Sequence, residues 1–351
     1  MKTQKALVTG SGGLIGSECV RLLGTQGWEI TGLDNNLRQF FFGEGGSTLT
    51  NTETLKKEVS RYRHFSVDIR DRQKVRDIFE SERPDFIIHA AAQPSHDKAA
   101  SIPEIDFDVN ALGTMNILIA ARDFCRESPF CFTSTNKVYG DHPNQLPIVE
   151  QAERYDYQPG TDGIDETMSI DQCLHSVFGA SKVAADIMCQ EFARYFGMPI
   201  GIFRAGCVTG PQHAAVELHG YLAYIVMCAT SGTPYTIFGY KGKQVRDQIH
   251  CRDVARLFLE FHNNPRCGEV YNIGGGRGNS LSLLETIRLL KDMGHPLNYQ
   301  YNPKNRIGDH ICYISNLHKV CSHFPKWKLE HDLPLILGEM VSHFSKQPDS
   351  I

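Results

Sequence analysis

Short apolar runs alternate with longer segments of helical periodicity through the first 200 residues. Strands are predicted at residues 5–9, 28–33, 85–90, 130–133 and 198–204, and a further strand ends at 67–69. Helices are predicted between them, at residues 15–27, 71–82, 107–126 and 178–196. Strict alternation of strand and helix is typical of a parallel sheet with helices on both faces. The pattern therefore predicts an α/β fold with a doubly wound parallel sheet.

The pattern becomes irregular after about residue 205, with short strands, turns and two or three helices. A helix is predicted at 281–293, with Ser280 as its N-cap and four apolar residues on one face. A chain of 351 residues is long enough for two domains at roughly 150 residues each. We therefore predict a first domain of residues 1–204 and a smaller C-terminal α/β domain of residues 205–351, with some chain crossing between them.

Two further segments are ambiguous. Residues 43–60 are rich in Gly, Ser and Thr and follow three adjacent phenylalanines, Phe40 to Phe42. We interpret them as a surface loop in which the phenylalanines pack locally, the alternative being a lid over a ligand. Residues 220–240 carry no charge over 21 positions, enough for a membrane span. Polar and proline residues at 230–234 interrupt them, which favours a buried helix, a turn and a short strand.

Composition excludes several classes of protein. Hydrophobic residues make up 41% of the chain, as in globular proteins. The 36 basic and 40 acidic residues leave a net charge of −4, which gives no support for nucleic-acid binding. The eleven cysteines form no C-x-x-C pair, so neither a metal cluster nor a disulfide scaffold is indicated. With no signal peptide in the N-terminal residues, we expect a cytoplasmic protein without a membrane anchor.

A glycine-rich turn follows the first predicted strand. Gly10, Gly13 and Gly16 have the spacing G-x-x-G-x-x-G, and Leu14 and Ile15 open the next helix. Glycines there allow a tight turn and close approach of the backbone to a pyrophosphate. The N-terminus of the helix offers free N–H groups and the positive end of its dipole. The sequence thus predicts a Rossmann dinucleotide site.

Asp34 lies 18 residues after Gly16, where the second strand ends. A carboxylate there accepts hydrogen bonds from ribose hydroxyls and repels a 2′-phosphate, which favours NAD over NADP although Arg38 is close. The alternative is a glycine turn without a ligand. It is weakened by Asp68, which lies at the predicted end of the next strand, and by the small residues after His89.

The chain resembles the extended short-chain dehydrogenases/reductases that act on nucleotide sugars, from residue 5 to about 330. The segments that carry the resemblance are Gly10–Gly16, Asn110–Thr114, Phe132–Gly140, Phe178–Lys182, Val245–Asp247, Ile249–Val254 and Tyr271–Gly274. Within this group the chain is most similar to the CDP-paratose (CDP-tyvelose) 2-epimerase family. The segments that indicate this are Ser134–Asp141, Gly163–Glu166, His175–Ser176, Gly242–Asp247, Asn272–Gly275 and Ser280–Glu285.

The resemblance implies an NAD-containing isomerase that inverts C2 of a CDP-linked sugar, with the nucleotide sugar held by the C-terminal domain. It also implies a homodimer or homotetramer paired through the helices at 107–126 and 178–196. The predicted cofactor contacts are Gly10, Gly13, Leu14, Ile15, Asp34, Asn35, Arg38, Asp68, Ile69, Ala90, Ala91, Gln93, Asn110 and Lys182.

Phe178 stands where the family carries its proton-exchanging tyrosine, four residues before Lys182. Phenylalanine has no proton to exchange, so three explanations stay open. Another residue is the acid/base, and the candidates are His96, Asp97, Lys137, Tyr139 and His175. Alternatively, Thr135 and Lys182 relay the proton through a water, or the chain binds its ligands without turnover. We single out His96, because histidine titrates near neutral pH.

Thr135 and Lys182 are the other predicted catalytic residues. The resemblance implies that Thr135 hydrogen-bonds the reacting sugar oxygen and that Lys182 holds the nicotinamide ribose. The alternatives are a strand-end hydroxyl and a solvated lysine. Asn136 and Lys137 occupy the positions of the Asp–Glu acid/base pair of sugar 4,6-dehydratases, so water elimination is not expected. Both also line the predicted sugar site with Phe178.

The diphosphate of a nucleotide sugar requires cations, and the resemblance implies that Arg246 and Arg306 supply them. A guanidinium fork matches phosphate oxygens, although each arginine could instead form a surface ion pair. Cys207 stands where many relatives carry a substrate-binding asparagine. It is either a small core residue or part of the pocket wall.

Overall fold

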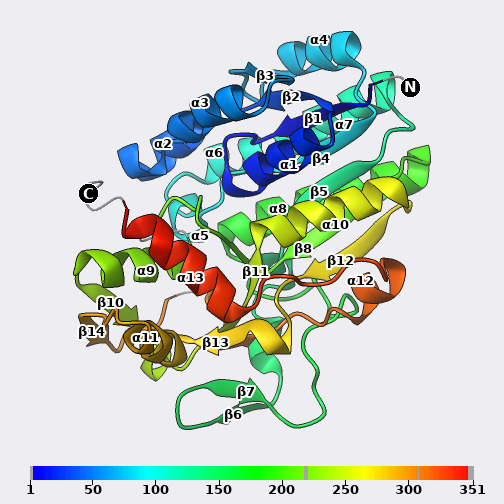
Figure 1. Ribbon diagram of the computed structural model, residues 1–351. Coiled ribbons are helices and arrows are strands. Elements are labelled where there is room, and N and C mark those ends of the chain that lie inside the picture. Colours follow the sequence, from blue (N-terminus) through cyan, green and yellow to red (C-terminus); the bar gives the residue numbers. More distant parts are fainter. Residues whose placement is uncertain (1–2, 217–219, 307, 347–351) are drawn as a thin grey trace.

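A seven-stranded parallel sheet forms the centre of the protein in a computed structural model, which describes residues 3–216, 220–306 and 308–346. Its strands, in spatial order, are β12 (Glu269–Ile273), β8 (Ile200–Ala205), β5 (Phe130–Thr135), β4 (Phe86–His89), β1 (Lys5–Thr9), β2 (Glu29–Leu33) and β3 (Tyr62–Phe65). All neighbouring pairs are parallel, and the order reverses between β1 and β4 (Figure 1). This is the Rossmann arrangement, so the predicted fold class is confirmed.

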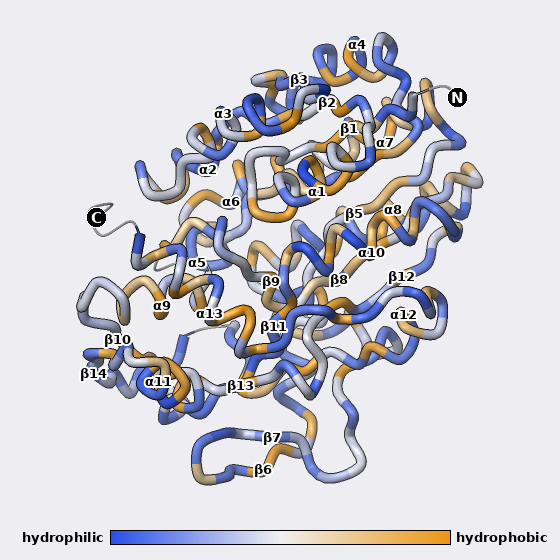
Figure 2. Tube along the Cα trace, viewed as in Figure 1, coloured by the Kyte–Doolittle hydropathy of each residue, from blue (hydrophilic) through white to orange (hydrophobic). Residues whose placement is uncertain are grey.

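Helices cover both faces of this sheet. One face packs on α1 (Leu14–Thr25) and α10 (Cys251–Asn263), and the other on α4 (Arg72–Glu82), α7 (Gly113–Phe124) and α8 (Ser176–Phe196). α4 shows why such a segment is helical: Asp71 caps it by accepting from the Lys74 amide, and its buried residues recur at helical spacing. Figure 2 shows the resulting alternation of hydrophilic and hydrophobic positions along α4.

The prediction of a surface loop at residues 43–60 is wrong in part. The three phenylalanines lie in α2 (Leu37–Phe42), and α3 (Leu49–Glu58) occupies most of residues 43–60. Only Thr52 and Leu55 of α3 are buried, so its periodicity is weak. Long-range hydrogen bonds hold it instead: the Asn51 side-chain amide donates to the Gly12 carbonyl at 2.8 Å. Two short helices, α5 (His96–Ala99) and α6 (Pro103–Phe107), follow β4.

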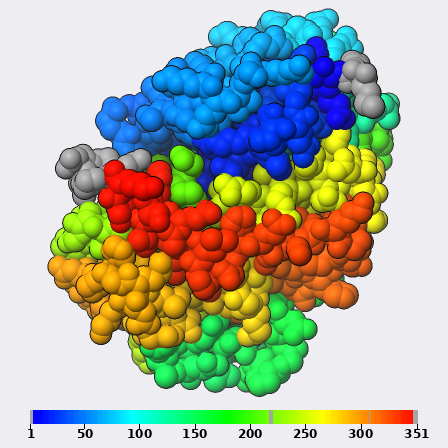
Figure 3. All heavy atoms as spheres, viewed as in Figure 1, coloured from blue at the N-terminus to red at the C-terminus, as the bar shows by residue number. Residues whose placement is uncertain are grey.

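The C-terminal part forms smaller sheets. In one, β11 (Val245–His250) pairs with β9 (Cys207–Thr209), β13 (Ser280–Ser282) and β15 (Cys312–Tyr313). The remaining elements are the pair β10 (Tyr235–Phe238) and β14 (Tyr299–Asn302), the hairpin of β6 (Ile148–Glu150) and β7 (Tyr155–Tyr157), and the helices α9 (Tyr221–Ser231), α11 (Leu283–Asp292), α12 (His318–His323) and α13 (Leu333–Phe344). In Figure 3 the red atoms of α13 lie between the blue N-terminal atoms and the gold C-terminal ones.

Residues 220–240 fold as the predicted buried helix, turn and strand, α9 followed by β10. None of the helices within the described ranges is long and apolar enough to cross a membrane. The predicted N-cap of α11 is wrong by two residues. Ser280 begins β13, and Ser282 caps the helix in a reciprocal pair of hydrogen bonds with Glu285. β12 returns from the C-terminal part to pair with β8 in the main sheet.

Candidate active site

A cavity of about 420 Å³ opens at the carboxyl ends of β1, β2, β4 and β5. In open α/β sheets, ligands bind beyond these strand ends, where the strand order reverses. The wall continues from the glycine turn after β1, past the ends of β4 and β5, to residues of β9 and β11. The cavity therefore joins the N-terminal sheet to the C-terminal part of the chain.

Two glycines of the first turn are required by its geometry. Gly10 has φ +66°, and a Cβ there would lie 2.8 Å from the Ala91 amide nitrogen. A Cβ on Gly16 would collide with the Gly10 carbonyl. The turn is therefore packed closely between β4 and the start of α1, and Gly13, Leu14 and Ile15 line the cavity. The N-terminus of α1 points at this wall, where it favours an anion.

Asp34 lies at the end of β2 and lines the cavity, but the protein itself already engages its carboxylate. It accepts hydrogen bonds from the Gly12 amide at 3.0 Å and from the Thr48 hydroxyl at 3.0 Å. Arg38 also lines the cavity and donates to the Ala214 carbonyl at 3.3 Å. Burial lowers the pKa of Arg38 to about 10, which leaves the guanidinium charged at neutral pH.

Asp68 and Asn35 form a second polar corner. The Asn35 amide donates to Asp68 at 2.9 Å, and Arg70 holds the same carboxylate through two side-chain bonds. Asp68 and Asn35 line the cavity together with Ile69, Ala90 and Ala91. The structure thus brings these predicted cofactor residues to one wall.

Gln93 and Asn110 are exceptions. Both are almost completely buried and do not line the cavity. The Gln93 amide N–H donates to the Asn110 side chain at 2.9 Å, and both side chains donate to Asp106. Sequence position alone placed them at the cofactor, because they flank the residues that do reach it. Their polar groups are used inside the protein to fix the segment after β4.

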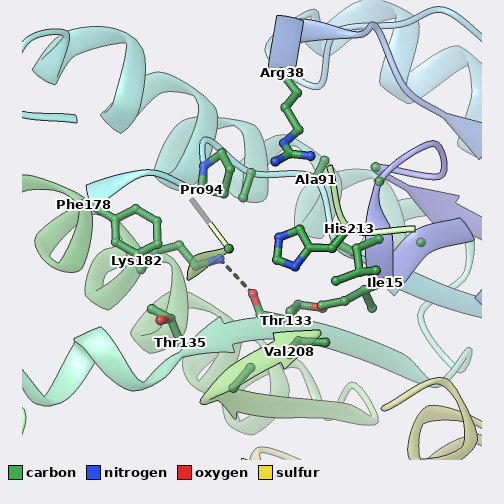
Figure 4. Close-up of a pocket in the computed structure, with 18 of the residues that line it drawn as sticks. Ile15, Arg38, Ala91, Pro94, Thr133, Thr135, Phe178, Lys182, Val208 and His213 are labelled. Carbon is green, nitrogen blue, oxygen red and sulfur yellow. Dashed lines mark hydrogen bonds between the residues drawn. The ribbon is translucent and has the colours of Figure 1, made fainter. Parts of the chain in front are cut away.

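The end of β5 and the first turns of α8 form the next part of the wall. Figure 4 shows Phe178 and Lys182 on one side and Thr133 and Thr135 below them. The Lys182 amine donates to the Thr133 carbonyl at 2.8 Å and lies 4.3 Å from the centre of the Phe132 ring. Burial lowers the pKa of Lys182 to about 8.

The acid/base candidates separate clearly. His96, Asp97 and Lys137 line the cavity, whereas Tyr139 and His175 do not. The Tyr139 hydroxyl lies in the core and donates to Asn272 at 2.8 Å. The His175 ring is bonded to the Ile170 carbonyl at 2.8 Å. Among the candidates, only the first three can meet a ligand in this cavity.

Charged residues converge at the far end of the cavity. Arg246 is bound to the Asp309 carboxylate and donates to the His310 carbonyl at 2.6 Å. Burial alone would raise the pKa of Asp309, but the charges of Arg246 and Lys137 hold it well below its usual range. Cys207 lies in this wall, and burial raises its pKa to about 11, so the thiol stays protonated at neutral pH.

Arg306 is paired with Asp97, a residue 209 positions earlier in the chain. The Asp97 carboxylate also lies 3.1 Å from the His96 ring. Burial would raise the pKa of Asp97, but hydrogen bonding and charge from His96 and Arg306 lower it. The Asp97–Arg306 pair therefore bridges the N-terminal and C-terminal parts across the cavity.

Every aspartate in the wall has a partner. Four carboxylates line the cavity within the described residues, and they are Asp34, Asp68, Asp97 and Asp309. Asp34 accepts hydrogen bonds from an amide and a hydroxyl, and Asp68 accepts them from Arg70. Asp97 and Asp309 each pair with an arginine. No group of three or more His, Cys, Asp or Glu in this part of the chain is arranged to hold a metal.

Comparison with known proteins identifies the family. The model of the NAD dependent epimerase/dehydratase family matches residues 6–274. The chain belongs to this family. Its cofactor is therefore NAD.

Relatives within the family act on different nucleotide sugars. CDP-paratose 2-epimerase of Salmonella typhi is 33% identical over 295 residues, 82% of this chain and 84% of that protein. dTDP-glucose 4,6-dehydratase of Salmonella typhimurium is 29% identical over 289 residues, 77% of this chain and 72% of that protein. The UDP-glucose 4-epimerase of Thermus thermophilus, solved with NAD, has a TM-score of 0.79 at 25% identity, covering 99% of this chain and all of that one.

The wall residues fit this family's cofactor. The close packing around Gly10 and Gly16 leaves backbone, rather than side chain, facing the position of a pyrophosphate. Asp34 and Asp68 would meet the adenosine half, and Lys182 would meet the nicotinamide ribose. NAD, when bound, supplies an acceptor for a hydride and returns it.

The wall also contains residues that were not predicted from the sequence, among them Thr48, His213 and Asp309. Thr48 precedes a helix that the sequence did not predict. His213 follows β9 and is shown in Figure 4 in the middle of the cavity view, opposite Arg38. Asp309 could have been suspected from its position three residues after Arg306. An acidic residue that close to one predicted phosphate-binding arginine can pair with the other such arginine, Arg246.

Proposed function

We propose that this family member epimerises a nucleotide-linked sugar, at C2 of a CDP-sugar. The observation that carries the proposal is the set of side chains after Thr135. Asn136 and Lys137 follow it in the wall, where dehydratases carry an Asp–Glu pair, and every wall carboxylate already holds a partner. Elimination of water requires a free acid and base beside the sugar. Oxidation followed by reduction at one carbon requires only a single group that takes the hydroxyl proton and later returns it.

Four side chains orient the sugar nucleotide and the cofactor in this proposal. The Thr135 hydroxyl, which lines the cavity at the end of β5, hydrogen-bonds the reacting oxygen. Lys182 holds the nicotinamide ribose, so the reacting carbon and the cofactor ring meet between β5 and α8. Arg246 and Arg306 neutralise the diphosphate at the far end, where cationic forks match phosphate oxygens.

The choice of C2 and of cytidine rests on resemblance to one relative, the CDP-paratose 2-epimerase. Two alternatives keep the same cavity: epimerisation of another nucleotide sugar, or binding of NAD and a nucleotide sugar without turnover, as the ring of Phe178 in place of a tyrosine suggests. Thr135, Lys182, Arg246 and Arg306 all line the cavity, which favours turnover, because a pure sensor needs no hydroxyl at the sugar carbon.

The test uses CDP-paratose and CDP-tyvelose, each carrying deuterium at C2, with products followed by NMR. We expect interconversion with the deuterium retained, because the hydride leaves and returns within one active site. Absence of interconversion would remove the CDP-sugar assignment. A panel of UDP-, GDP- and dTDP-sugars then separates the alternatives: loss of water indicates a dehydratase, and absence of both exchange and transient NADH absorbance indicates a binding protein.

Two further properties are part of the proposal. We place the protein in the cytoplasm, a compartment that suits eleven free cysteines. We also propose a homodimer or homotetramer paired through α7 and α8. Leu112, just before α7, and Ile187 and Tyr195 of α8 are exposed apolar residues that would suit such a contact. Light scattering that gives the mass of a monomer would contradict it.

A further inference from the structure

The proposed reaction lacks a proton carrier at the position where the family has one. The Phe178 ring lines the cavity and is only 7% exposed. A phenyl ring cannot accept the proton of a sugar hydroxyl. Another group in the same part of the wall must do so as the carbon loses its hydride.

Lys137 lies in that part of the wall. Its amide N–H donates to the Thr135 hydroxyl oxygen at 3.2 Å, so the two residues share one turn after β5. The start of α8 packs directly on this turn, because a Cβ on Gly179 would lie 2.9 Å from the Lys137 carbonyl oxygen. Phe178 and Lys137 are thus neighbours, and both side chains line the cavity.

The surroundings of the Lys137 amine suit a group that changes its charge. The amine donates to the Gly308 carbonyl at 2.9 Å and lies 3.7 Å from Asp309. Burial lowers its pKa, and Arg246 and Arg306 act in the same direction, while Asp309 and Cys207 oppose them. Asp309 is also bound to Arg246, so its charge is shared between two cations. The amine can therefore lose a proton at a pH where an ordinary lysine cannot.

The other candidates are paired as well, and none of them lies on the turn directly after Thr135. Lys182 lies on the Phe132 ring and the Thr133 carbonyl, where it suits the cofactor ribose. His96 is paired with Asp97, which also holds Arg306. Lys137 is the titratable side chain that follows Thr135 most closely in the wall.

We propose that Lys137 is the catalytic proton carrier that replaces the missing phenol; the assignment rests on the proposed epimerisation. The neutral amine takes the proton of the sugar hydroxyl while the hydride of the same carbon passes to the cofactor. The O–H and C–H bonds break, and an N–H bond and a carbonyl form. When the hydride returns to the opposite face, the ammonium gives the proton back, so neither charge nor electrons change overall.

The first test compares Lys137→Met with Lys319→Met. Lys319 is a matched control, because its amine also donates to a backbone carbonyl, Val270 at 2.8 Å, and pairs with a glutamate, but it does not line the cavity. Epimerisation by the holoenzyme should fall at least about 100-fold in kcat for Lys137→Met, with a smaller change in KM. Lys319→Met should keep the wild-type rate. Turnover retained in Lys137→Met overturns the proposal.

A double variant guards against a simple folding defect. Phe178→Tyr in the Lys137→Met background places a phenol four residues before Lys182, on the same face of α8. We expect it to restore at least about a tenth of the wild-type rate, with a pH profile shifted from that of the wild type. Failure to restore activity in a double variant that melts at the wild-type temperature overturns the proposal.

A second readout does not depend on turnover. The lysines of the holoenzyme are reductively methylated with ¹³C-formaldehyde, and the signal absent from Lys137→Met is titrated by NMR. It should titrate below the range of the exposed lysines and shift when CDP is added; titration with the exposed lysines overturns the proposal. A wild-type protein that converts no sugar in the panel overturns the proposed function and this role together, whereas activity retained in Lys137→Met overturns this role alone.

Discussion

Phe178 and Lys182 occupy one face of α8, four residues apart, and both reach the cavity. Without the phenol, this pair retains a buried amine that donates to the Thr133 carbonyl and lies against the Phe132 ring. The pair can still position a cofactor ribose, but it can no longer exchange a proton with a sugar through residue 178. A single oxygen atom therefore separates this chain from the usual chemistry of its helix position.

Restoring that atom is informative. Phe178→Tyr should fold normally and keep or raise kcat, because the added hydroxyl points into the cavity rather than into the core. The pH profile should gain a second basic group. Phe192→Tyr, on the same helix but in the core, is the control and should lower the melting temperature without changing the profile. Complete loss of activity in Phe178→Tyr would mean that the phenyl ring itself shapes the sugar pose.

The buried amine of Lys182 also makes stability depend on pH. Burial lowers its pKa from 10.5 to about 8, so the unfolded chain binds more protons than the folded one between these values. Stability therefore rises with pH in that window, and the cost of burying Lys182 is full below pH 8. From pH 8 to pH 10 the wild type should gain about 2 kcal/mol in its free energy of unfolding relative to Lys182→Met. Urea unfolding measures this, and Lys291→Met, which changes an exposed lysine, should show no such gain.

Among the elements, the turn between β1 and α1 has the strictest requirements. Gly10 combines a positive φ with close neighbours. Gly27, at the other end of α1, has φ +78°, and a Cβ there would meet no described atom within 4 Å. The two positions thus share a positive φ, which is strained only for a residue with a side chain, but they do not share steric crowding. Their comparison separates the general cost of a left-handed residue from the cost of crowding the nucleotide turn.

Gly27→Ala should lower the free energy of unfolding by about 1–2 kcal/mol and leave NAD bound, because only the backbone is strained. Gly10→Ala should cost more and should release NAD, because the new methyl group pushes the turn away from Ala90 and Ala91. Chemical unfolding and the absorbance of cofactor retained after gel filtration measure both effects. Equal losses in the two variants would contradict the role of crowding.

Regular local patterns were predictable from the sequence. Strands β1, β2, β4, β5 and β8, the helices α1, α4, α7 and α8, the glycine turn and Asp34 follow from periodicity and spacing. β3 ends at Phe65 rather than at 67–69, and neither β12 nor α10 was predicted. α3 did not, because only two of its residues are buried and distant hydrogen bonds to Gly12 and Asp34 hold the segment in place. Ser280 and Ser282 are equally good caps by residue type, but only Ser282 is followed three residues later by a glutamate, Glu285, which is the capping-box signal that was missed.

The candidate site was predictable to a similar degree. The wall contains almost all of the expected residues, because they follow strand ends whose order is set by the sheet. Gln93 and Asn110 were misplaced, since a residue's neighbours in sequence do not tell which way its side chain turns. The partners of the two arginines, Asp97 and Asp309, could not be assigned, because one of these contacts joins residues 209 positions apart.

For the whole molecule, the Asp97–Arg306 and Asp309–Arg246 ion pairs decide how a weakly acidic protein can accept an anionic ligand. The chain carries a net charge of −4, yet one end of its cavity gathers the two arginines Arg246 and Arg306. Asp97 and Asp309 neutralise much of that charge in the structure described. A diphosphate therefore competes with the protein's own carboxylates for these arginines, and the Asp97–Arg306 pair joins the N-terminal and C-terminal parts of the chain in the cavity wall.

Because phosphate and carboxylate compete for the same arginine, substitutions of Arg306 and Asp97 should change the KM for the nucleotide sugar in opposite directions. Arg306→Gln should raise the KM for the nucleotide sugar about 10- to 100-fold, because a charge-assisted hydrogen bond to phosphate is lost, while kcat changes less. Asp97→Asn should lower the KM, because the guanidinium no longer has a carboxylate partner. Both effects should shrink at high salt. If Asp97 acts only through Arg306, the double variant should have the KM of Arg306→Gln alone. A KM for Asp97→Asn above that of the wild type would instead assign Asp97 a direct contact with the sugar.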